Sequence, residues 1–231
     1  MKKVILNLLM ISSVLFLFNS CNKDDSGTTE PDYSKDKGEF KDSRDDKIYK
    51  WVKIGTQIWM AENLAFKVDT GSWAYNNDEI NIGKYGYLYE WNTAITVIPE
   101  GWHLPSDEEW TTMEEYLSLN GFSYDGIVGN TDIAKSLAAN NGWGISDIIG
   151  AVGNTDFNET RNKTGFSALP GGSRNGSTGN FDTLRFCSDW WSSTTYDNEE
   201  ANCRRLLYRN PYVTSNSSSK ANGYSIRCIK D

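Results

Sequence analysis

The chain contains 231 residues and carries a formal net charge of −8 at neutral pH, because 31 Asp and Glu residues outnumber 23 Lys and Arg residues. An acidic surface of this kind repels phosphate backbones, so we expect no nucleic-acid partner. The length suffices for one domain with a substantial core, and Trp, Tyr and Phe make up 13% of the chain, which favours burial or interfaces built from large rings.

Residues 1–20 predict a lipoprotein export signal. Two lysines precede an apolar run, residues 4–18, that is too short for a typical membrane-spanning helix but suits a signal peptide. The run is followed by a small residue directly before Cys21, which resembles a lipobox, the motif whose cysteine receives fatty acyl chains. We therefore expect Cys21 to be lipidated and to anchor the protein to a membrane. An ordinary signal peptide with a chance cysteine is the alternative.

The next segment, residues 21–46, predicts a disordered tether. It is rich in Asp, Lys, Ser, Thr, Gly and Glu and has too few apolar side chains to offset the entropy of ordering. Within it, Lys23, Asp24 and Asp25 resemble the tag that directs lipoproteins of Bacteroidetes to the outer face of the outer membrane. We expect a lipid-anchored protein exposed at the cell surface, with its globular domain over residues 47–231.

The first predicted elements of that domain form a β-hairpin. Residues 48–54 alternate apolar and polar side chains, and the Gly55-Thr56 pair predicts a tight turn before a returning strand at residues 57–60. Further along, residues 85–91 alternate large rings with other residues, which predicts a strand with four rings on one face.

Two helices are predicted after these strands. Ser106 and Glu109 form a capping box at the start of the first, which ends at Gly121. Thr131 caps the second, which ends near Asn140. Strands are predicted around residues 190–193, 204–208 and 224–229. This order of elements predicts an α+β fold with a mixed or antiparallel sheet.

Six ordered sequence blocks resemble a known family. They are YKWVKIGTQIWMAENL (49–64), YGYLYEW (85–91), PEGWHLPSDEEW (99–110), TGFSALPGG (164–172), WSST (191–194) and GYSIRCIKD (223–231). In this order they resemble the Fibrobacter succinogenes major paralogous domain, found on lipoproteins and secreted proteins of Bacteroidetes and Fibrobacteres. The resemblance implies a C-type lectin-like fold, related to formylglycine-generating enzymes, with long C-terminal loops.

Three cysteines follow Cys21, namely Cys187, Cys203 and Cys228. An exported domain lies in an oxidising compartment, so one disulfide among these three cysteines is plausible. Any pairing leaves one thiol unpaired. The resemblance implies a cysteine just before the PEGW block as a partner for the C-terminal one, but Ile98 stands there. Cys228 then pairs with Cys187 or Cys203, or stays reduced.

Little in the sequence favours catalysis. The only histidine, His103, has no nucleophile motif beside it, so we expect a structural role. Formylglycine-generating enzymes use a close pair of cysteines, whereas Cys187 and Cys203 are far apart in the chain. Clustered His and Cys ligands and the calcium motifs of C-type lectins are also missing. We therefore expect no enzymatic activity, no cofactor and no metal site.

Aromatic residues of the loop-rich C-terminal half are the candidate ligand contacts, because rigid rings provide contact area at small entropic cost. They are Trp143, Trp190, Trp191, Tyr196, Tyr208 and Tyr212. Core packing is the alternative, expected for one of the two adjacent tryptophans. The first hypothesis is a non-enzymatic module that binds a glycan or a surface protein. A structural component of a surface assembly is the second, and an enzyme with an unrecognised site is the third.

Overall fold

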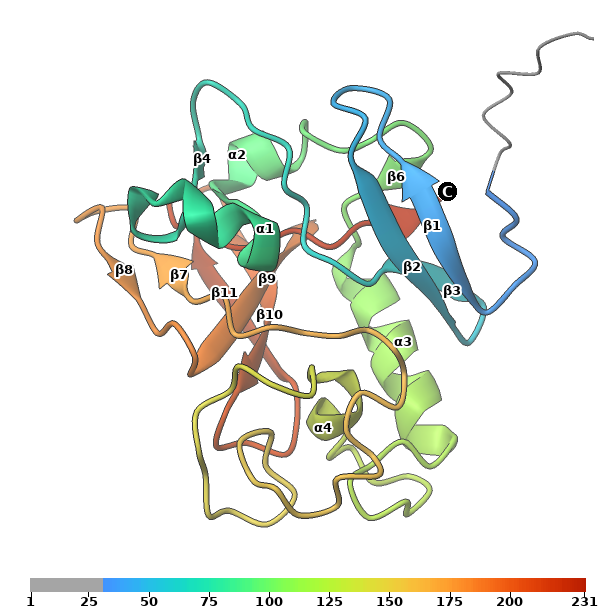
Figure 1. Cartoon of the computed structure of the whole chain (residues 1–231). Helices are drawn as coiled ribbons and strands as arrows, with labels where there is room; N and C mark the ends of the chain where they lie inside the picture. Colours follow the sequence, from blue (N-terminus) through green and yellow to red (C-terminus); the bar gives the residue numbers. More distant parts are fainter. Residues whose placement is uncertain (1–30) are drawn as a thin grey trace, which may run out of the picture. The chain divides into compact units, whose positions relative to one another are not determined.

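The computed structural model describes residues 31–231. Its largest sheet has five strands in the order β1-β2-β3-β12-β6, each antiparallel to its neighbours (Figure 1). These strands are β1 (Lys37–Lys41), β2 (Ile48–Ile54), β3 (Gln57–Met60), β12 (Ile229–Lys230) and β6 (Trp102–His103). Strands from both ends of the described chain therefore share one sheet.

A second sheet has three antiparallel strands in the order β11-β10-β9. They are β9 (Cys187–Thr195), β10 (Glu200–Leu207) and β11 (Thr214–Ser219). Two short sheets pair β4 (Ser72–Trp73) with β5 (Leu88–Tyr89) and β7 (Ser173–Arg174) with β8 (Phe181–Asp182).

Helices are few and mostly short. They are α1 (Ile82–Tyr85), α2 (Trp91–Ala94), α3 (Asp107–Leu119) and α4 (Ala134–Leu137), with 3-10 turns at Tyr75–Asn77 and Glu79–Asn81. Small antiparallel sheets with few helices make this an α+β fold, which confirms the predicted class. Within residues 31–231, none of the helices is long and apolar enough to cross a membrane.

The C-terminal segment 223–228 lies between residues 60–64 and strand β9 and is hydrogen-bonded to both. On one side its carbonyl groups accept hydrogen bonds from the amides of Met60 and Leu64, and on the other side the amide of Trp191 donates to it. Because both neighbours bond to this segment, the side chain of Arg227 is fixed in the middle of the fold.

Adjacent tryptophans of β9 divide the core into two clusters, because successive strand residues face opposite sides. Trp190 packs toward α3, where the ring centroid of Trp110 lies 6.1 Å from that of Trp190 and 4.7 Å from that of Trp59. Trp191 packs on the other side, with its ring centroid 4.5 Å from that of Tyr224. The predicted opposition of the two side chains is confirmed, but both are fully buried.

The first hairpin and the first helix lie where the sequence predicts them. β2 and β3 occupy residues 48–54 and 57–60, with Gly55 at a φ of 62° in the turn between them. At α3, the Ser106 hydroxyl accepts a hydrogen bond from the Glu109 amide at 3.2 Å, and the Glu109 carboxylate accepts one from the Ser106 amide at 2.7 Å. Both halves of the capping box are therefore present.

The predicted C-terminal boundary of the tether, residues 21–46, was wrong, because β1 lies within this range. Phe40 is paired with Tyr49 of β2, and the two rings stack with centroids 5.5 Å apart. Alternate residues of β1 are exposed and charged, so the strand lacks the apolar content by which strands are recognised. Residues 1–30 lie outside the described part of the chain.

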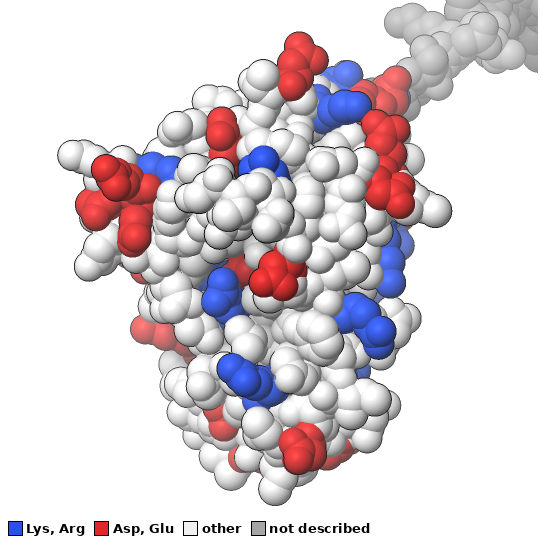
Figure 2. Space-filling view, turned by 90° about the vertical axis from the view of Figure 1, so that its left-hand side faces the viewer, with Lys and Arg blue, Asp and Glu red and all other residues white. Residues whose placement is uncertain are grey.

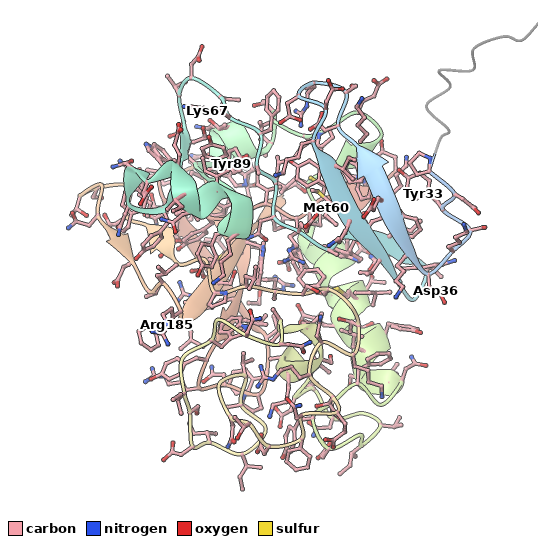
Figure 3. The ribbon with its side chains drawn as sticks, in the orientation of Figure 1. Tyr33, Asp36, Met60, Lys67, Tyr89 and Arg185 are labelled. Carbon is pink, nitrogen blue, oxygen red and sulfur yellow. The ribbon has the colours of Figure 1, made fainter. Side chains whose placement is uncertain are left out.

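Two further predictions of local structure were wrong. The predicted strand at residues 85–91 is interrupted, because Gly86, at a φ of 73°, ends α1 and α2 begins at Trp91. Only β5 remains of it, and Tyr89 of that strand lies fully buried in the interior (Figure 3). The second predicted helix is reduced to the four residues of α4.

Candidate functional site

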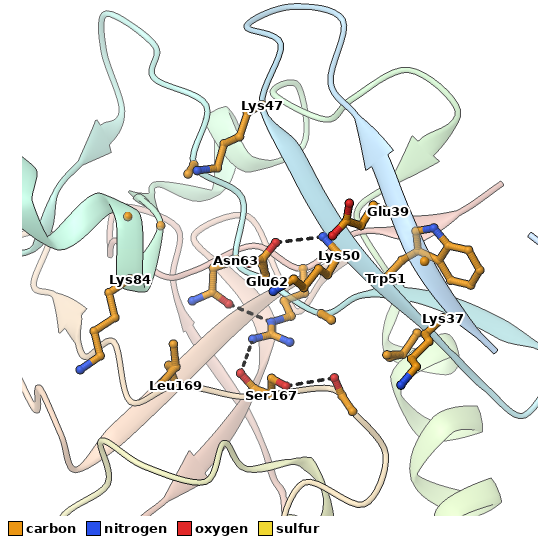
Figure 4. A pocket seen from close by; sticks show the side chains of 18 of the residues that line it. Lys37, Glu39, Lys47, Lys50, Trp51, Glu62, Asn63, Lys84, Ser167 and Leu169 are labelled. Atoms are coloured by element: carbon orange, nitrogen blue, oxygen red, sulfur yellow. Dashed lines mark hydrogen bonds between the residues drawn. The ribbon is translucent and has the colours of Figure 1, made fainter. Parts of the chain in front are cut away.

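A cavity of about 870 Å³ opens beside the outer face of β1 and β2. Its other walls are residues 61–65, helix α1 and residues 165–169, and Arg227 contributes to its lining. Figure 4 shows Lys50, Glu62 and Asn63 at the centre of this site, with Lys84 on one side and Lys37 on the other. Segments far apart in the sequence thus meet at one concave surface.

The strand register explains which side chains form the sheet wall. In the β1–β2 pair, Lys37 lies opposite Val52 and Glu39 lies opposite Lys50. Because side chains alternate along a strand, these four residues share one face of the sheet. The opposite face carries Tyr49 and Trp51 in one core cluster, whereas the face toward the cavity carries three charged side chains beside the buried Val52.

Four lysines surround the cavity without a charged partner. Within residues 31–231, none of their ammonium groups takes part in an ion pair or a hydrogen bond, and they come from β1, β2, the turn before β2, and α1. They are Lys37, Lys47, Lys50 and Lys84. Two glutamates, Glu39 and Glu62, also line the cavity, so basic groups predominate there in a chain that is acidic as a whole.

Arg227 lies beneath this lysine-rich surface and is only 1% exposed. Its guanidinium donates to the carbonyl oxygens of Phe166 and Ser167, the latter at 3.0 Å, and to Asn63 Oδ1 at 2.9 Å. All these acceptors are uncharged, and no carboxylate of the described chain forms an ion pair with Arg227. Burial lowers the pKa of Arg227 to about 9, and the negative charge of Glu62 opposes this shift in part.

The same guanidinium holds the loop wall in place. It stacks over the ring of Phe166, 4.2 Å from the centroid, while it binds the carbonyl groups of residues 166 and 167. Asn63 completes the arrangement, because its Oδ1 also accepts from Trp190 Nε1 at 3.0 Å and its amide nitrogen donates to Tyr85 O at 2.8 Å. The wall is therefore tied to the core and to α1.

Glycine is required at the end of α1, where the backbone passes close to residues 63–64 of the same chain. A Cβ on Gly86 would lie 2.5 Å from the carbonyl oxygen of Leu64, a distance that backbone atoms cannot accommodate without moving. Gly83 differs, since it lines the cavity and no atom lies within 4 Å of its Cβ position. We therefore expect a large side chain at residue 83 to narrow the cavity without disturbing the backbone.

Charged side chains elsewhere on the surface are more mixed. On the face shown in Figure 2, basic side chains lie in several separate places, with acidic and uncharged residues between and around them. This face therefore carries no single large positive patch.

The structure does not bring the predicted aromatic contacts together. Trp190 and Trp191 are fully buried, and Trp143 is partly buried with its indole nitrogen donating to Ala168 O at 3.0 Å, so these rings serve the core. Tyr196 and Tyr212 are 68% and 45% exposed, but Tyr196 lies before the start of β10 and Tyr212 lies after its end. Eight residues of strand separate such positions by roughly 26 Å. Tyr208 packs its ring against Phe186, 5.0 Å away.

The three candidate disulfide cysteines are all free and buried. In the β9–β10 register, Cys187 lies opposite Leu207 and Cys203 lies opposite Trp191. The two cysteines are thus four strand positions apart, or about 13 Å, which exceeds the reach of a disulfide. Cys228 bonds to neither. Burial raises the pKa of Cys203 to about 12 and raises the pKa values of Cys187 and Cys228 as well.

His103 is held between two carboxylates. Its Nδ1 lies 2.7 Å from Asp231 Oδ1 and its Nε2 lies 2.8 Å from Glu109 Oε1. Burial lowers the pKa of His103, but its hydrogen bonds to the carboxylates of Asp231 and Glu109, together with their negative charges, outweigh burial and raise the pKa above its usual value. Both ring nitrogens are occupied, as expected of a structural histidine. The described residues contain no group of three or more His, Cys, Asp and Glu side chains that could hold a metal ion.

Some predicted site residues lie outside the described chain, namely Cys21, Lys23, Asp24 and Asp25. Sequence reasoning missed the cavity, although one signal was present. Arg227 is a charged residue between Ile226 and Cys228 in an apolar block, and a charge in such a position is buried for a structural or functional reason.

Comparison with known proteins identifies one family. A family model described as the Fibrobacter succinogenes major domain matches residues 52–230, well over half of the chain. Arg227, Lys84 and Glu62 fall within the match, whereas Lys37, Lys47 and Lys50 precede it. No curated protein and no solved structure matches the chain.

Proposed function

This chain belongs to the Fibrobacter succinogenes major domain family, and from that premise we propose that it is a lipid-anchored, non-enzymatic binding module exposed at the outer membrane. The anchor rests on the lipobox-like sequence at Cys21, and surface exposure rests on Lys23, Asp24 and Asp25. The chain then presents its domain to glycans or proteins outside the cell. We include a C-type lectin-like fold in the proposal, supported by the little regular structure between α4 and β7, where that fold carries long loops.

The cavity at the β1–β2 face is the observation that carries the binding function. It has a volume within the range of small-molecule and cofactor sites, about 300–1,000 Å³. Its walls are fixed by Arg227 and Asn63, so it is formed before any ligand arrives, which reduces the entropic cost of binding. For the ammonium groups of the lysines on its rim, residues 31–231 supply no ion-pair or hydrogen-bond partner.

A substitution at Gly83 tests this proposal. Gly83→Trp should fill the cavity, whereas Gly83→Ala adds one methyl group at the same position and serves as the matched control. We would apply both full-length variants and the wild-type chain, purified in detergent, to an array of glycans and surface proteins. Binding that Gly83→Trp abolishes and Gly83→Ala retains, with circular dichroism unchanged, supports the proposal. Binding that survives Gly83→Trp contradicts it.

A structural role in a surface assembly is the second candidate, and exposed apolar side chains favour it. Several lie on the loops around the end of α3 and before β7, where Tyr124 packs against Phe157 with ring centroids 4.9 Å apart. The exposed side chains are Leu119, Ile127, Val128, Ile145, Ile148 and Ile149. Contiguous exposed apolar surface marks sites of protein association. Co-purification of surface proteins that is lost in Ile148→Asp and kept in Gly83→Trp would favour this role over ligand binding.

The lipid anchor has an independent test. Cys21→Ser should release the protein from membranes into the soluble fraction, since several acyl chains are needed for stable attachment. Continued tight retention of this variant would contradict the proposed anchor.

A further inference from the structure

We propose that the cavity at the β1–β2 face binds an acidic oligosaccharide, whose anionic groups lie against the lysines of the rim and whose hydroxyl groups donate to Glu39 and Glu62. This inference rests on the proposed function, because it names the ligand class of the same cavity.

Charge is the first reason to expect an anion. The cavity is lined by four lysines and Arg227 against two glutamates, in a chain whose formal net charge is −8. A concave, low-dielectric wall concentrates the field of such groups, so a charged ligand is attracted more strongly there than on a flat surface. The acidic remainder of the surface repels the same ligand, which directs it to this position.

Arg227 adds a buried positive charge that forms no ion pair in the described chain and is opposed only by the nearby charge of Glu62. A buried guanidinium is normally paired with a carboxylate, because burying an unpaired charge is costly. Here its hydrogen-bond acceptors are three main-chain carbonyl groups, those of Met60, Phe166 and Ser167, and the amide oxygen of Asn63. These acceptors bind its N–H groups but do not neutralise its positive charge. That charge attracts an anion in the cavity that Arg227 helps to line. A bound anion would supply the missing negative charge without displacing these hydrogen bonds.

The two glutamates distinguish a sugar from other anions. A carboxylate accepts hydrogen bonds but donates none when it is ionised. Glu62 Oε2 accepts from the Lys50 amide at 2.9 Å, its Oε1 has no partner in the described chain, and neither oxygen of Glu39 has one. Ionised acidic side chains of a peptide are acceptors only and offer these oxygens no donor. An acidic sugar carries both anionic groups for the lysines and hydroxyl donors for the glutamates.

Distribution of the lysines indicates several anionic groups on one ligand. Lys50 projects from β2 and Lys84 from α1, on different walls of the site (Figure 4). A single small anion would contact one of them, whereas a short chain of acidic sugars spans both walls. Charge-assisted hydrogen bonds to ammonium groups are stronger than neutral ones, so each such contact is worth retaining.

Charge-reversal variants provide the test, with the full-length chain purified in detergent. The probes are trigalacturonate, which carries carboxylates, a sulfated tetrasaccharide, and the methyl ester of trigalacturonate, which keeps the sugar but removes the charge. Isothermal titration should show saturable binding of at least one acidic probe, weakened by raising salt from 50 to 200 mM. Lys50→Glu and Lys84→Glu should each weaken it about tenfold or more. Lys53→Glu is the matched control, because Lys53 is exposed on the same strand and faces the other way, and it should leave binding unchanged.

Other results would overturn the inference. They are the absence of binding to both acidic probes, equal affinity for the methyl ester, an equal effect of Lys53→Glu, or equal affinity for hexaglutamate, which would indicate an acidic peptide. If a neutral glycan binds and Gly83→Trp abolishes that binding while the charge reversals do not, the ligand class is wrong and the proposed function stands. If Gly83→Trp alters no binding, the proposed function is wrong too.

Discussion

Replacing Arg227 by methionine should destabilise the fold substantially. Arg227 is buried and donates to the carbonyl oxygens of Phe166 and Ser167. Methionine has a similar length but no donor, so both carbonyl groups lose this partner. A buried acceptor left without a hydrogen bond costs about 1–3 kcal/mol, so two cost roughly 2–6 kcal/mol. Removal of a buried charge offsets part of this loss, and we expect the free energy of unfolding to fall by about 3 kcal/mol.

Urea denaturation followed by tryptophan fluorescence measures this change. The midpoint should fall while the dependence of the unfolding free energy on urea stays constant, because the surface exposed on unfolding changes little. Arg209→Met is the matched control, since Arg209 is exposed and has no ion pair or hydrogen bond in the described chain, and it should change stability by less than about 0.5 kcal/mol. An Arg227→Met variant as stable as the wild type would refute the view that this guanidinium holds the cavity wall.

Three further predictions concern groups outside the cavity. His103→Gln should destabilise the protein more at pH 5.5 than at pH 8.5 in urea titrations. The raised folded-state pKa of His103 stabilises the fold below about pH 6.5, and this contribution is lost as pH rises through the folded-state pKa. An equal effect at both pH values would exclude the ion pairs with Glu109 and Asp231. Ser106→Ala should lower the unfolding free energy by about 1 kcal/mol through loss of the α3 cap, and a neutral result would show that the capping box contributes nothing. Cys187, Cys203 and Cys228 are buried, so a thiol reagent should modify none of them in the folded protein at pH 8 but all three in urea without reductant. Fewer reactive thiols in urea would reveal a disulfide.

Local signals predicted the elements whose structure depends on nearby residues. The hairpin turn at Gly55 and the capping box at Ser106 are determined within a few positions, so their boundaries could be placed from the sequence. The strand prediction for residues 85–91 was wrong because it rested on the side-chain pattern and not on the backbone conformation of its glycine. Its alternating rings matched a strand pattern, but Gly86 adopts a positive φ and ends α1, and α2 begins at Trp91, so only β5 remains between them.

The candidate site depended on long-range pairing and could not be assembled from the sequence. Lys50, Lys84 and Arg227 meet only because the C-terminal segment bonds to residues 60–64 and to β9. The adjacent tryptophans Trp190 and Trp191 look like a binding surface in sequence, yet each belongs to a different buried cluster. An aromatic composition alone does not distinguish a ring that fills the core from one that contacts a ligand.

Lysine acylation of the full chain tests most directly whether the cavity is the ligand site. The rate of modification at each lysine would be measured by mass spectrometry with and without trigalacturonate. Bound sugar should slow acylation at Lys50 and Lys84 while Lys53, exposed on the other side of the same strand, reacts at its original rate. Unchanged rates at Lys50 and Lys84, or slowing confined to lysines outside the cavity, would contradict the account.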